Sequence, residues 1–582
     1  MLVASSRQTL ARDVGDVWDS GKVLFGESLG IRYSGKPLQS DRVYFWKVRV
    51  WDRDGEPTDW SPPAFWSTGL LDSTDWKARW IGLDRAVDGD APDSPGRRLS
   101  ARMLRREFTL HGAVERATAF VCGLGLFELY VNGRKIGDNV LAPALSEYDR
   151  RVYYQTLDVT GALRQGRNAV GVVLGNGRYF APRTDNPTRT RTFGFPKLLL
   201  QINVHFEDGT TARVISDGRW KVTAGGPIRA NNEYDGEVYD ARREMPGWAN
   251  PGFDDSDWRP VELVEGPRGV LASQPNEPIK VTQTLEPVAL NEPKPGVWIF
   301  DMGQNMVGWV RLHVRGKRGT KVRLRFAEVL NPDGTLNTAN LRSAKATDVY
   351  ILKGQGEEVW EPRFTYHGFR YVELTGYPGE PDLSTIEGRV VHDALEKTGD
   401  FACSNPLLNQ IYRNAVWGIR GNYRSVPTDC PQRDERQGWL GDRSEECRGE
   451  SFIFHVVNLY SKWMRDVQDA QRPSGSIPDL APAYWPFYND NTTWPGTFLI
   501  APGNMLAQYG DVETVRAHYE AMKRWVRYMR RYLKNGIMTR DSYGDWCYPP
   551  KNRHLIHSHD TSRMTSGELI GTAYFYHELR LL

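Results

Sequence analysis

The sequence is poor in cysteine, in net charge and in long apolar runs. Five cysteines occur in 582 residues, and their odd number and wide spacing resemble neither a disulfide framework nor a CxxC metal site. The 75 basic and 72 acidic residues leave a net charge of only +3, which excludes a broad electrostatic attraction for nucleic acid or an anionic membrane. A neutral partner is the natural inference.

No apolar run approaches the roughly 20 residues that a membrane-spanning helix requires. The first residues also lack the charged start and the apolar stretch of about 7–15 residues that define a signal peptide. We therefore predict a soluble protein without a membrane partner. The compartment, cytoplasmic or periplasmic, stays open, because the sequence does not establish that residue 1 is the true N-terminus.

Aromatic residues are abundant by contrast. They make up 12% of the chain and include 20 tryptophans. Tryptophan anchors the sheets of β-sandwiches and also stacks against sugar rings. We expect both uses here.

The first two thirds of the sequence has the period-2 pattern and frequent turns of β-structure. Residues 44–51 and 322–326 alternate apolar with polar side chains. Asn132-Gly133 lies between two alternating runs and is the strongest hairpin signal. We predict a partial fibronectin-III-like β-sandwich at 1–70, a jelly-roll-like sandwich at 71–278 and a further sandwich at 279–395. The first unit falls short of the roughly 100 residues of such a sandwich, so we expect a clipped N-terminus.

Near residue 400 the period changes from 2 to 3.6, which indicates helices. Ser404 is the expected cap of a first helix, with Pro406 in its first turn. Its apolar face contains Leu407, Leu408, Ile411, Ala415 and Ile419. Further helices are predicted at 452–469 and 512–533, and Thr565-Ser566-Gly567-Glu568 is expected to form a capping box for a last one.

A polar stretch rich in carboxylates and glycine lies between the first two of these helices, at residues 428–442. It contains two arginines, a tryptophan and the carboxylates Asp429, Asp434, Glu435 and Asp442. Carboxylates accept hydrogen bonds from hydroxyls, arginine orients a neighbouring carboxylate, and indole covers the apolar face of a sugar. When carboxylates are crowded together, their pKa values become different, so that one carboxyl can stay protonated and act as a general acid. The alternative is an ordinary solvated surface run.

The order of residues in this stretch resembles the signature of the bacterial α-L-rhamnosidases of glycoside hydrolase family 78. That signature reads Asp-Cys-Pro-x-Arg-Asp-Glu-Arg-x-Gly-Trp-x-Gly-Asp, and residues 429–442 meet every fixed position. The resemblance implies that Glu435 is the general acid. It further implies a rhamnose pocket formed by Asp429, Arg433, Trp439, Asp442, Trp494 and Trp546.

The resemblance also implies that residues 396–582 belong to an (α/α)₆ barrel. Twelve helices with their loops need about 350 residues, so we expect the barrel to be incomplete. The family inverts configuration, and its second carboxylate, the general base, would lie beyond residue 582. We therefore predict a fragment truncated at both ends, with little or no hydrolysis.

A base inside the chain is the alternative, and three carboxylates are candidates: Asp490, Asp545 and Glu446. The sequence departs from the common family pattern at residues 494–497, Trp-Pro-Gly-Thr, where many members read Trp-Gly-Asp-Ala. It departs again at the charged residues 443–446. Both departures put the substrate specificity in question.

No cofactor is expected. The oxygen-rich segment 231–242 offers ligands suited to Ca²⁺, but they fit no regular ligand spacing and a capped turn is the favoured interpretation. His554, His557 and His559 lack an accompanying cysteine, so a polar loop is favoured over a zinc site.

The leading hypothesis is an enzyme that removes terminal α-L-rhamnose from glycosides or polysaccharides by an inverting, two-carboxylate mechanism. A non-catalytic, multi-module protein that binds rhamnose is the alternative. Another (α/α)₆ enzyme, such as a polysaccharide lyase or phosphorylase, is a third reading. The sequence does not decide the aglycone, the linkage, whether the β units bind sugar, or whether the protein forms a homodimer.

Overall fold

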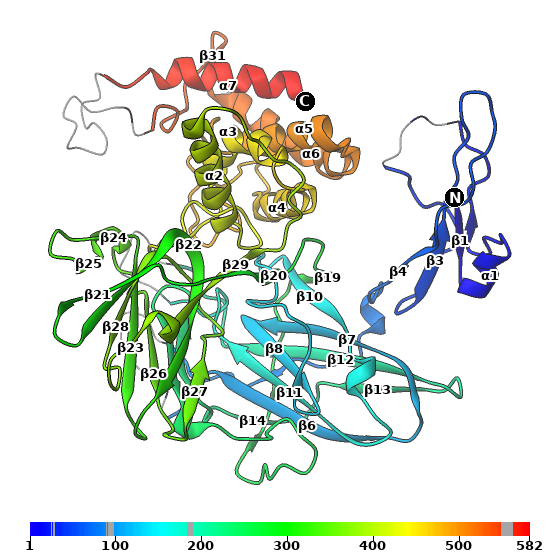
Figure 1. The fold of residues 1–582 in the computed structure, drawn as a ribbon. Coiled ribbons are helices and arrows are strands. Elements are labelled where there is room, and N and C mark those ends of the chain that lie inside the picture. The colour runs from blue at the N-terminus through cyan, green and yellow to red at the C-terminus, as the bar shows by residue number, and fades with distance from the viewer. Residues whose placement is uncertain are drawn as a thin grey trace.

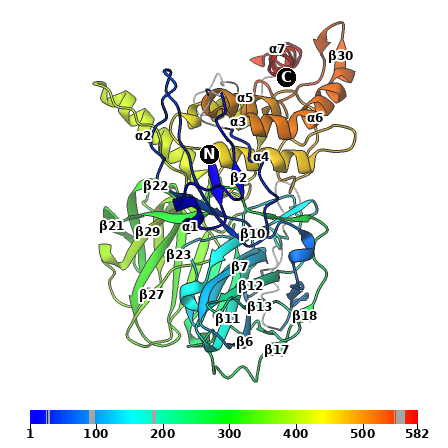
Figure 2. The same ribbon diagram turned by 90° about the vertical axis from the view of Figure 1, so that its right-hand side faces the viewer.

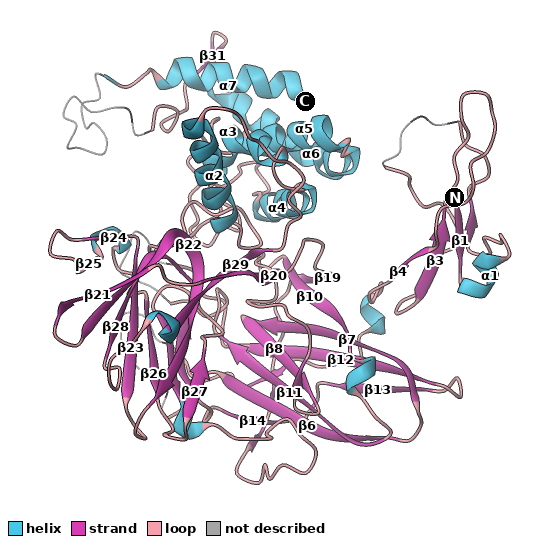
Figure 3. Ribbon diagram, in the orientation of Figure 1, coloured by secondary structure: helices cyan, strands magenta, loops and turns pink. Residues whose placement is uncertain are grey.

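The computed structural model describes residues 1–24, 26, 30–88, 90, 98–182, 190–546, 548 and 563–582. β-Units occupy the N-terminal two thirds, and helices gather in one C-terminal unit above them (Figures 1 and 3). A view turned by 90° shows the same arrangement (Figure 2). Within the described residues no helix is both long and apolar enough to cross a bilayer. The predicted order, β units followed by a helical unit, is confirmed.

A small four-stranded sheet forms the N-terminal unit, which stands to one side in Figure 1. Its strand order is β2-β1-β3-β4. The strands are β1 (Leu2–Ala4), β2 (Trp18–Asp19), β3 (Val43–Lys47) and β4 (Ala64–Ser67), with the short helix α1 (Arg7–Ala11) after β1. The strand predicted at 44–51 therefore ends at residue 47.

Two facing sheets form the next unit, a β-sandwich. One has the order β18-β5-β12-β7-β10-β19, with β13 beside β12. It contains β5 (Ile81–Gly82), β7 (Val114–Leu124), β10 (Arg151–Asp158), β12 (Lys197–Phe206), β13 (Thr211–Ile215), β18 (Glu262–Leu263) and β19 (Val270–Ser273). The other has the order β17-β14-β6-β11-β8-β9. It contains β6 (Arg102–Leu110), β8 (Leu126–Val131), β9 (Arg134–Lys135), β11 (Gly166–Gly175), β14 (Lys221–Thr223) and β17 (Arg259–Pro260).

The predicted Asn132-Gly133 hairpin is confirmed between β8 and β9. Val131 pairs with Arg134, and both turn residues have positive φ, 50° and 80°. A two-residue type I′ turn requires positive φ at both positions, which asparagine and glycine tolerate best. A local signal thus fixed this register.

A ten-stranded sheet forms the third β unit, in the order β15-β16-β26-β23-β28-β22-β29-β20, with β21 and β27 also on β22. Its strands are β15 (Ile228–Asn232), β16 (Gly236–Asp240), β20 (Ile279–Leu285), β21 (Ala289–Lys294), β22 (Val297–Arg315), β23 (Lys321–Ala327), β26 (Thr347–Ile351), β27 (Glu357–Trp360), β28 (His367–Thr375) and β29 (Ile386–Asp393). The small hairpin of β24 (Val329–Leu330) and β25 (Leu336–Asn337) follows β23 in the chain.

Strand pairing crosses the domain boundary that the sequence suggested at residue 278. The hairpin β15–β16 precedes that boundary, yet β16 runs parallel to β26 of the ten-stranded sheet. The chain then returns to the sandwich through β17, β18 and β19. The two large β units are therefore interlocked.

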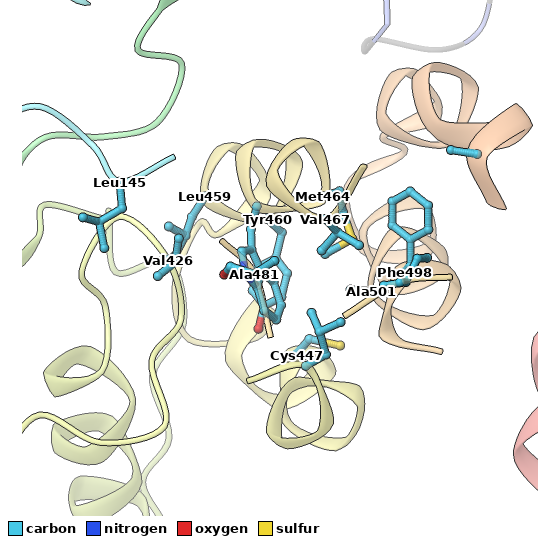
Figure 4. Close-up of a cluster of buried hydrophobic side chains, with 14 of the residues drawn as sticks. Leu145, Val426, Cys447, Leu459, Tyr460, Met464, Val467, Ala481, Phe498 and Ala501 are labelled. Atoms are coloured by element: carbon cyan, nitrogen blue, oxygen red, sulfur yellow. Dashed lines mark hydrogen bonds between the residues drawn. The ribbon is translucent and has the colours of Figure 1, made fainter. Parts of the chain in front are cut away.

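Six α-helices, with a short hairpin, form the described part of the helical unit. They are α2 (Pro406–Gly421), α3 (Leu440–Ser451), α4 (Val457–Ala470), α5 (Thr497–Tyr509), α6 (Val512–Met529) and α7 (Gly567–Leu581), with the hairpin β30 (Leu533–Lys534) and β31 (Ile537–Met538) after α6. Their shared core includes Cys447, Tyr460, Met464 and Phe498 (Figure 4). It continues into sandwich residues such as Phe120, so the helices and the sandwich form one packed body.

The helix starts differ in detail from those predicted. Asn405, not Ser404, caps α2, because its side chain accepts a hydrogen bond from the Leu407 amide. The N-cap of α7 is Ser566, whose side chain makes no capping hydrogen bond. The predicted capping box at 565–568 is therefore wrong. Asp545 instead accepts a hydrogen bond from the Thr565 amide.

The apolar face predicted for α2 is covered only at its C-terminal end by the described residues, where Ile419 packs against the core. Leu407, Leu408 and Ile411 are 65%, 47% and 53% exposed, and α2 contains no buried residue. Helical periodicity identifies which side chains share a face. It does not say what packs on that face.

A buried cluster of opposite charges connects the three large units. Glu233, in the turn of the β15–β16 hairpin, accepts hydrogen bonds from Arg178 Nε at 2.8 Å and from Arg424 Nη2 at 3.0 Å. Arg178 follows β11 of the sandwich, and Arg424 follows α2. Arg436 also donates to the backbone oxygen of Glu233. The four side chains are at least 95% buried.

In segment 231–242, where a Ca²⁺ site was considered, carboxylates accept hydrogen bonds from protein donors. Glu233 binds arginines, and Asp240 accepts hydrogen bonds from Arg242 Nε and Nη2 at 2.8 and 2.9 Å. Asp235 accepts a hydrogen bond from Asn232 Nδ2 at 2.9 Å. These contacts favour the capped-turn interpretation.

Glu233→Gln tests the importance of this cluster. Removing the charge leaves buried arginines without their counter-ion, which costs about 3–5 kcal/mol. The urea midpoint, followed by tryptophan fluorescence, should fall substantially. Glu513→Gln is the control, because Glu513 pairs with Arg32 in an exposed salt bridge and its loss should leave the midpoint unchanged. Equal midpoints for the two variants would contradict the interpretation.

Candidate active site

The predicted signature forms a loop between α2 and α3. The Asp429 amide donates to the Gln437 backbone oxygen at 2.9 Å, and the Gln437 amide donates to Asp429 Oδ1 at 2.7 Å. These reciprocal bonds close the loop. Gly368 on β28 allows the loop to pack closely on the sheet, because a Cβ at this position would lie only 2.9 Å from Pro431 Cγ. The loop is thus set against the ten-stranded sheet.

Glu435 is held by three donors, two from this loop region and one from the ten-stranded β unit. Trp439 Nε1 donates to its Oε1 at 2.9 Å, and Arg433 Nε donates to its Oε2 at 3.0 Å. The third donor is Arg342, whose Nη2 lies 2.6 Å from Oε2. The Glu435 side chain is 13% exposed, so its carboxyl is oriented but still reachable.

Asp429 lies beside Glu435. Carboxylate oxygens of the two residues are within 4.8 Å of each other, and Arg433 Nη2 donates to Asp429 Oδ2 at 3.4 Å. Burial, with the neighbouring charge of Glu435, raises the pKa of Asp429 to about 7. Like charges at this distance oppose double ionisation. Asp429 therefore carries a proton below neutral pH.

Asp442 differs from these two residues. It lies in the first turn of α3 and is exposed, and no hydrogen bond to it occurs within the described residues. A carboxylate at the first turn of a helix is favourably placed in the field of the helix dipole. Asp442 is thus an available acceptor for hydroxyl groups.

The tryptophans predicted for the pocket fall into two groups. Trp439 packs beside Phe487 and Trp485, with ring centroids 6.0 and 6.5 Å apart. Trp494 lies 4.9 Å from Tyr543, which lies 5.6 Å from Trp546. Trp546 is 66% exposed.

Gly441 brings the second group next to the signature. A Cβ at this position would lie 2.2 Å from the indole carbons of Trp494. Only glycine lets the indole lie directly against the first turn of α3. The glycine of the signature is thereby explained by contact with a residue 53 positions later.

Arg342, Tyr543 and Asp479 belong to the site although the sequence analysis assigned them no role. Asp479 Oδ2 accepts hydrogen bonds from Asn489 Nδ2 at 2.6 Å and from the Tyr543 hydroxyl at 3.3 Å. This holds Tyr543 between the two indoles. The contacts join residues distant in sequence, so no local spacing could have revealed them.

The three carboxylates considered as a general base already have partners. Asp490 accepts hydrogen bonds from Ser476, Tyr528 and Tyr532 at 2.6–2.7 Å. Glu446 Oε2 accepts one from Arg443 at 2.6 Å, and Asp545 Oδ2 accepts one from the Thr565 amide at 2.7 Å.

One group of side chains in the described residues has the spacing of metal ligands: Asp429, Cys430 and Glu435, with ligand atoms within 4.8 Å. The guanidinium of Arg433 bonds to both carboxylates and supplies the positive charge that a metal would bring. Burial raises the pKa of the Cys430 thiol well above its ordinary value, which disfavours the thiolate ligand. The predicted histidine cluster, His554, His557 and His559, lies outside the described residues.

Asp429→Asn tests the protonation of this site. The folded chain holds a proton at Asp429 up to about pH 7, whereas an unfolded aspartate releases it near pH 3.9. Asp429 therefore contributes stability below about pH 4 that is lost as the pH rises to about 7. Urea midpoints should show the parent losing stability relative to Asp429→Asn across this window. A constant difference would contradict the assignment.

Four family profiles match the chain. They are the Rha78A-like N-terminal immunoglobulin domain at residues 2–72, the alpha-L-rhamnosidase N-terminal domain at 112–283, the bacterial alpha-L-rhamnosidase concanavalin-like domain at 291–392 and the bacterial alpha-L-rhamnosidase 6 hairpin glycosidase domain at 396–582. The order and kinds of domain agree with the sheets and helices described above.

Curated relatives and solved structures agree. An alpha-L-rhamnosidase of Streptomyces avermitilis is 34% identical over 747 residues, covering 100% of this chain and 70% of that protein. One from Formosa agariphila is 37% identical, covering 100% and 62%. The structure of alpha-L-rhamnosidase from Dictyoglumus thermophilum has a TM-score of 0.92 at 42% identity, covering 100% and 65%.

The structure of the Streptomyces avermitilis protein complexed with L-rhamnose has a TM-score of 0.91 at 33% identity, covering 100% of this chain and 70% of that one. The chain thus spans about two thirds of the length of these relatives. It belongs to the bacterial α-L-rhamnosidases of glycoside hydrolase family 78.

Proposed function

We propose that this chain carries the sugar-binding and proton-donating part of an α-L-rhamnosidase that removes terminal α-L-rhamnose. The observation that supports it best is the position of Glu435 within a complete family signature. Its carboxyl is fixed by Trp439 and Arg433 and lies beside a second carboxyl, Asp429. Proton transfer to the leaving oxygen needs such an oriented and accessible acid.

The surrounding side chains suit a neutral, hydroxyl-rich ligand. Asp442 offers carboxylate acceptors, and Arg433 offers guanidinium donors at a 36% exposed side chain. Trp439 and Trp494 provide flat apolar surfaces for the faces of a pyranose. A rhamnose-containing glycoside or polysaccharide is therefore the proposed partner.

We propose that the reaction inverts configuration, with a base separate from the residues considered so far. An inverting pair needs carboxyl groups about 6.5–9.5 Å apart to admit a water molecule. Oxygens of Asp429 and Glu435 lie within 4.8 Å, which is too close. Asp490, Asp545 and Glu446 have other partners. Hydrolysis by this chain alone should therefore be weak or absent.

Release of the aryl group from an aryl α-L-rhamnoside, with the chain and its Glu435→Gln variant compared, tests the catalytic proposal. If the chain turns over, Glu435→Gln should lower the rate by about 10²–10⁴-fold for poor leaving groups, because general acid catalysis is worth that much. An unchanged rate in the variant would refute the role of Glu435. Turnover that depends on Glu435 would instead refute the proposed lack of a base.

A non-catalytic rhamnose-binding protein is the second candidate function. The engaged state of all three candidate bases favours it. Saturable binding of L-rhamnose without any product would support it. Product formed from a rhamnoside in a manner that requires Glu435 would favour the enzyme.

Gly441→Ala tests the contribution of Trp494 to the pocket. The added Cβ would meet the indole at 2.2 Å and should displace it, weakening L-rhamnose binding by about tenfold, or about 1.4 kcal/mol. Gly449→Ala is the matched control on the same helix, since a Cβ there meets nothing within 4 Å. Its helix should become slightly more stable. Equal affinities in titration calorimetry would show that Trp494 does not contact the sugar.

A further inference from the structure

Arg342 reaches Glu435 from a different domain. It follows the short helix η4 (Ala339–Leu341) in the ten-stranded β unit, and its Nη2 lies 2.6 Å from Glu435 Oε2. Its Nε lies 2.8 Å from Asp434 Oδ1. One guanidinium thus bridges two adjacent carboxylates of the signature.

The backbone around Arg342 is fixed in an unfavourable conformation. Its φ is 54° and its ψ is −116°, a region that non-glycine residues rarely adopt. Leu341 before it is 1% exposed in the core of the β unit, and the Ser343 hydroxyl after it donates to Asp434 Oδ2 at 2.6 Å. Strain held by anchors on both sides is characteristic of functional positions.

The contact conflicts with proton donation by Glu435. Arg342, Arg433 and Trp439 together satisfy both carboxylate oxygens, and donors of this kind favour the ionised form. A general acid must instead present a protonated oxygen to the leaving oxygen. At least one donor has to leave Oε2 before the reaction.

Arg342 is the donor that can leave most easily. Trp439 is held by backbone pairing with Leu480 and by packing on Phe487. Arg433 belongs to the same closed loop as Glu435 and also binds Asp429. Arg342 has a long side chain, 34% exposed, and keeps a second carboxylate partner if Nη2 swings away.

We propose that Arg342 is a positioning residue that holds Glu435 as a carboxylate in the empty site, and that the leaving-group oxygen of a bound rhamnoside displaces it from Oε2. Arg342 then stays paired with Asp434. Glu435 takes up one proton from solvent and donates it to the glycosidic oxygen as the C1–O bond breaks, so that the leaving group departs as a neutral alcohol. A water molecule forms the new bond to C1 and gives up one proton to the separate base that the proposed function requires. The loop at 337–343 thereby forms the aglycone side of the site. This inference rests on the proposed function.

The hold on Glu435 can be measured without any ligand. Infrared difference spectra between a chain and its Glu435→Gln form, both carrying Asp429→Asn to remove the neighbouring carboxyl, isolate the Glu435 carboxyl. Its titration is then followed with Arg342 present and in Arg342→Gln. Loss of a cation from hydrogen-bond distance should move the midpoint up by about one pH unit or more. Arg342→Lys, which keeps the charge, should restore most of the parent behaviour. An unmoved midpoint in Arg342→Gln would overturn the proposal.

The displacement is tested with two ligands, methyl α-L-rhamnoside and 1,5-anhydro-L-rhamnitol. The second keeps the ring oxygen but lacks the exocyclic glycosidic oxygen at C1. Without Arg342 to displace, methyl α-L-rhamnoside should bind about fivefold more tightly to Arg342→Gln than to the parent, or about 1 kcal/mol. The anhydro sugar should bind both equally. Equal changes for the two ligands, or none, would show a merely structural role for Arg342.

Arg325→Gln is the matched control. Arg325 lies in the same β unit, is 36% exposed and pairs with Glu373 at 3.1 Å. It should change neither the titration nor the ratio of the two affinities, and a change there would count against the assignment to Arg342. Failure of the parent to bind either sugar would refute the proposed function, whereas the ligand-free titration would still decide the hold of Arg342 on Glu435.

Discussion

The buried charge cluster around Glu233 is the interaction on which the geometry of the site depends. One carboxylate takes hydrogen bonds from Arg178 of the sandwich and from Arg424 of the helical unit. Charges removed from water are tolerated only when they are paired. If one of these units moved away, a buried charge would lose its partner, which is energetically unfavourable. Arg436 adds a bond to the backbone of Glu233, which fixes the signature loop in the same frame.

The fixed frame gives neighbouring carboxylates of one loop different properties. Asp434 is fully buried and bound by Ser343 and Arg342, so its role is to join the loop to the β unit. Asp429 is buried next to a like charge, and its pKa rises to about 7. Asp442 is exposed on the first turn of α3. The environment, more than the residue type, assigns each carboxylate its chemistry.

The parts that the sequence predicted are those set by local signals. Asn132 and Gly133 specify their turn through positive φ, and the change of apolar period near residue 400 marks the first helix. The contiguous signature made Glu435 and its neighbours identifiable. The parts that it did not predict come from contacts between distant residues. The pairing of β16 with β26 joins residues more than 100 positions apart, and Gly441 is explained only by Trp494.

Arg342 illustrates why a signature cannot describe a whole active site. It lies 93 residues before Glu435 and in another domain, so no spacing rule connects the two. Its position instead follows from the burial of Leu341, from the bond of Ser343 to Asp434 and from a strained backbone between them. The signature supplies Glu435, which we propose as the acid, and a loop of the β unit supplies a cation at its carboxyl. The contacts of the Glu435 carboxyl therefore depend on how the β unit and the helices are held together, which connects the proposed catalytic chemistry to the buried ions around Glu233.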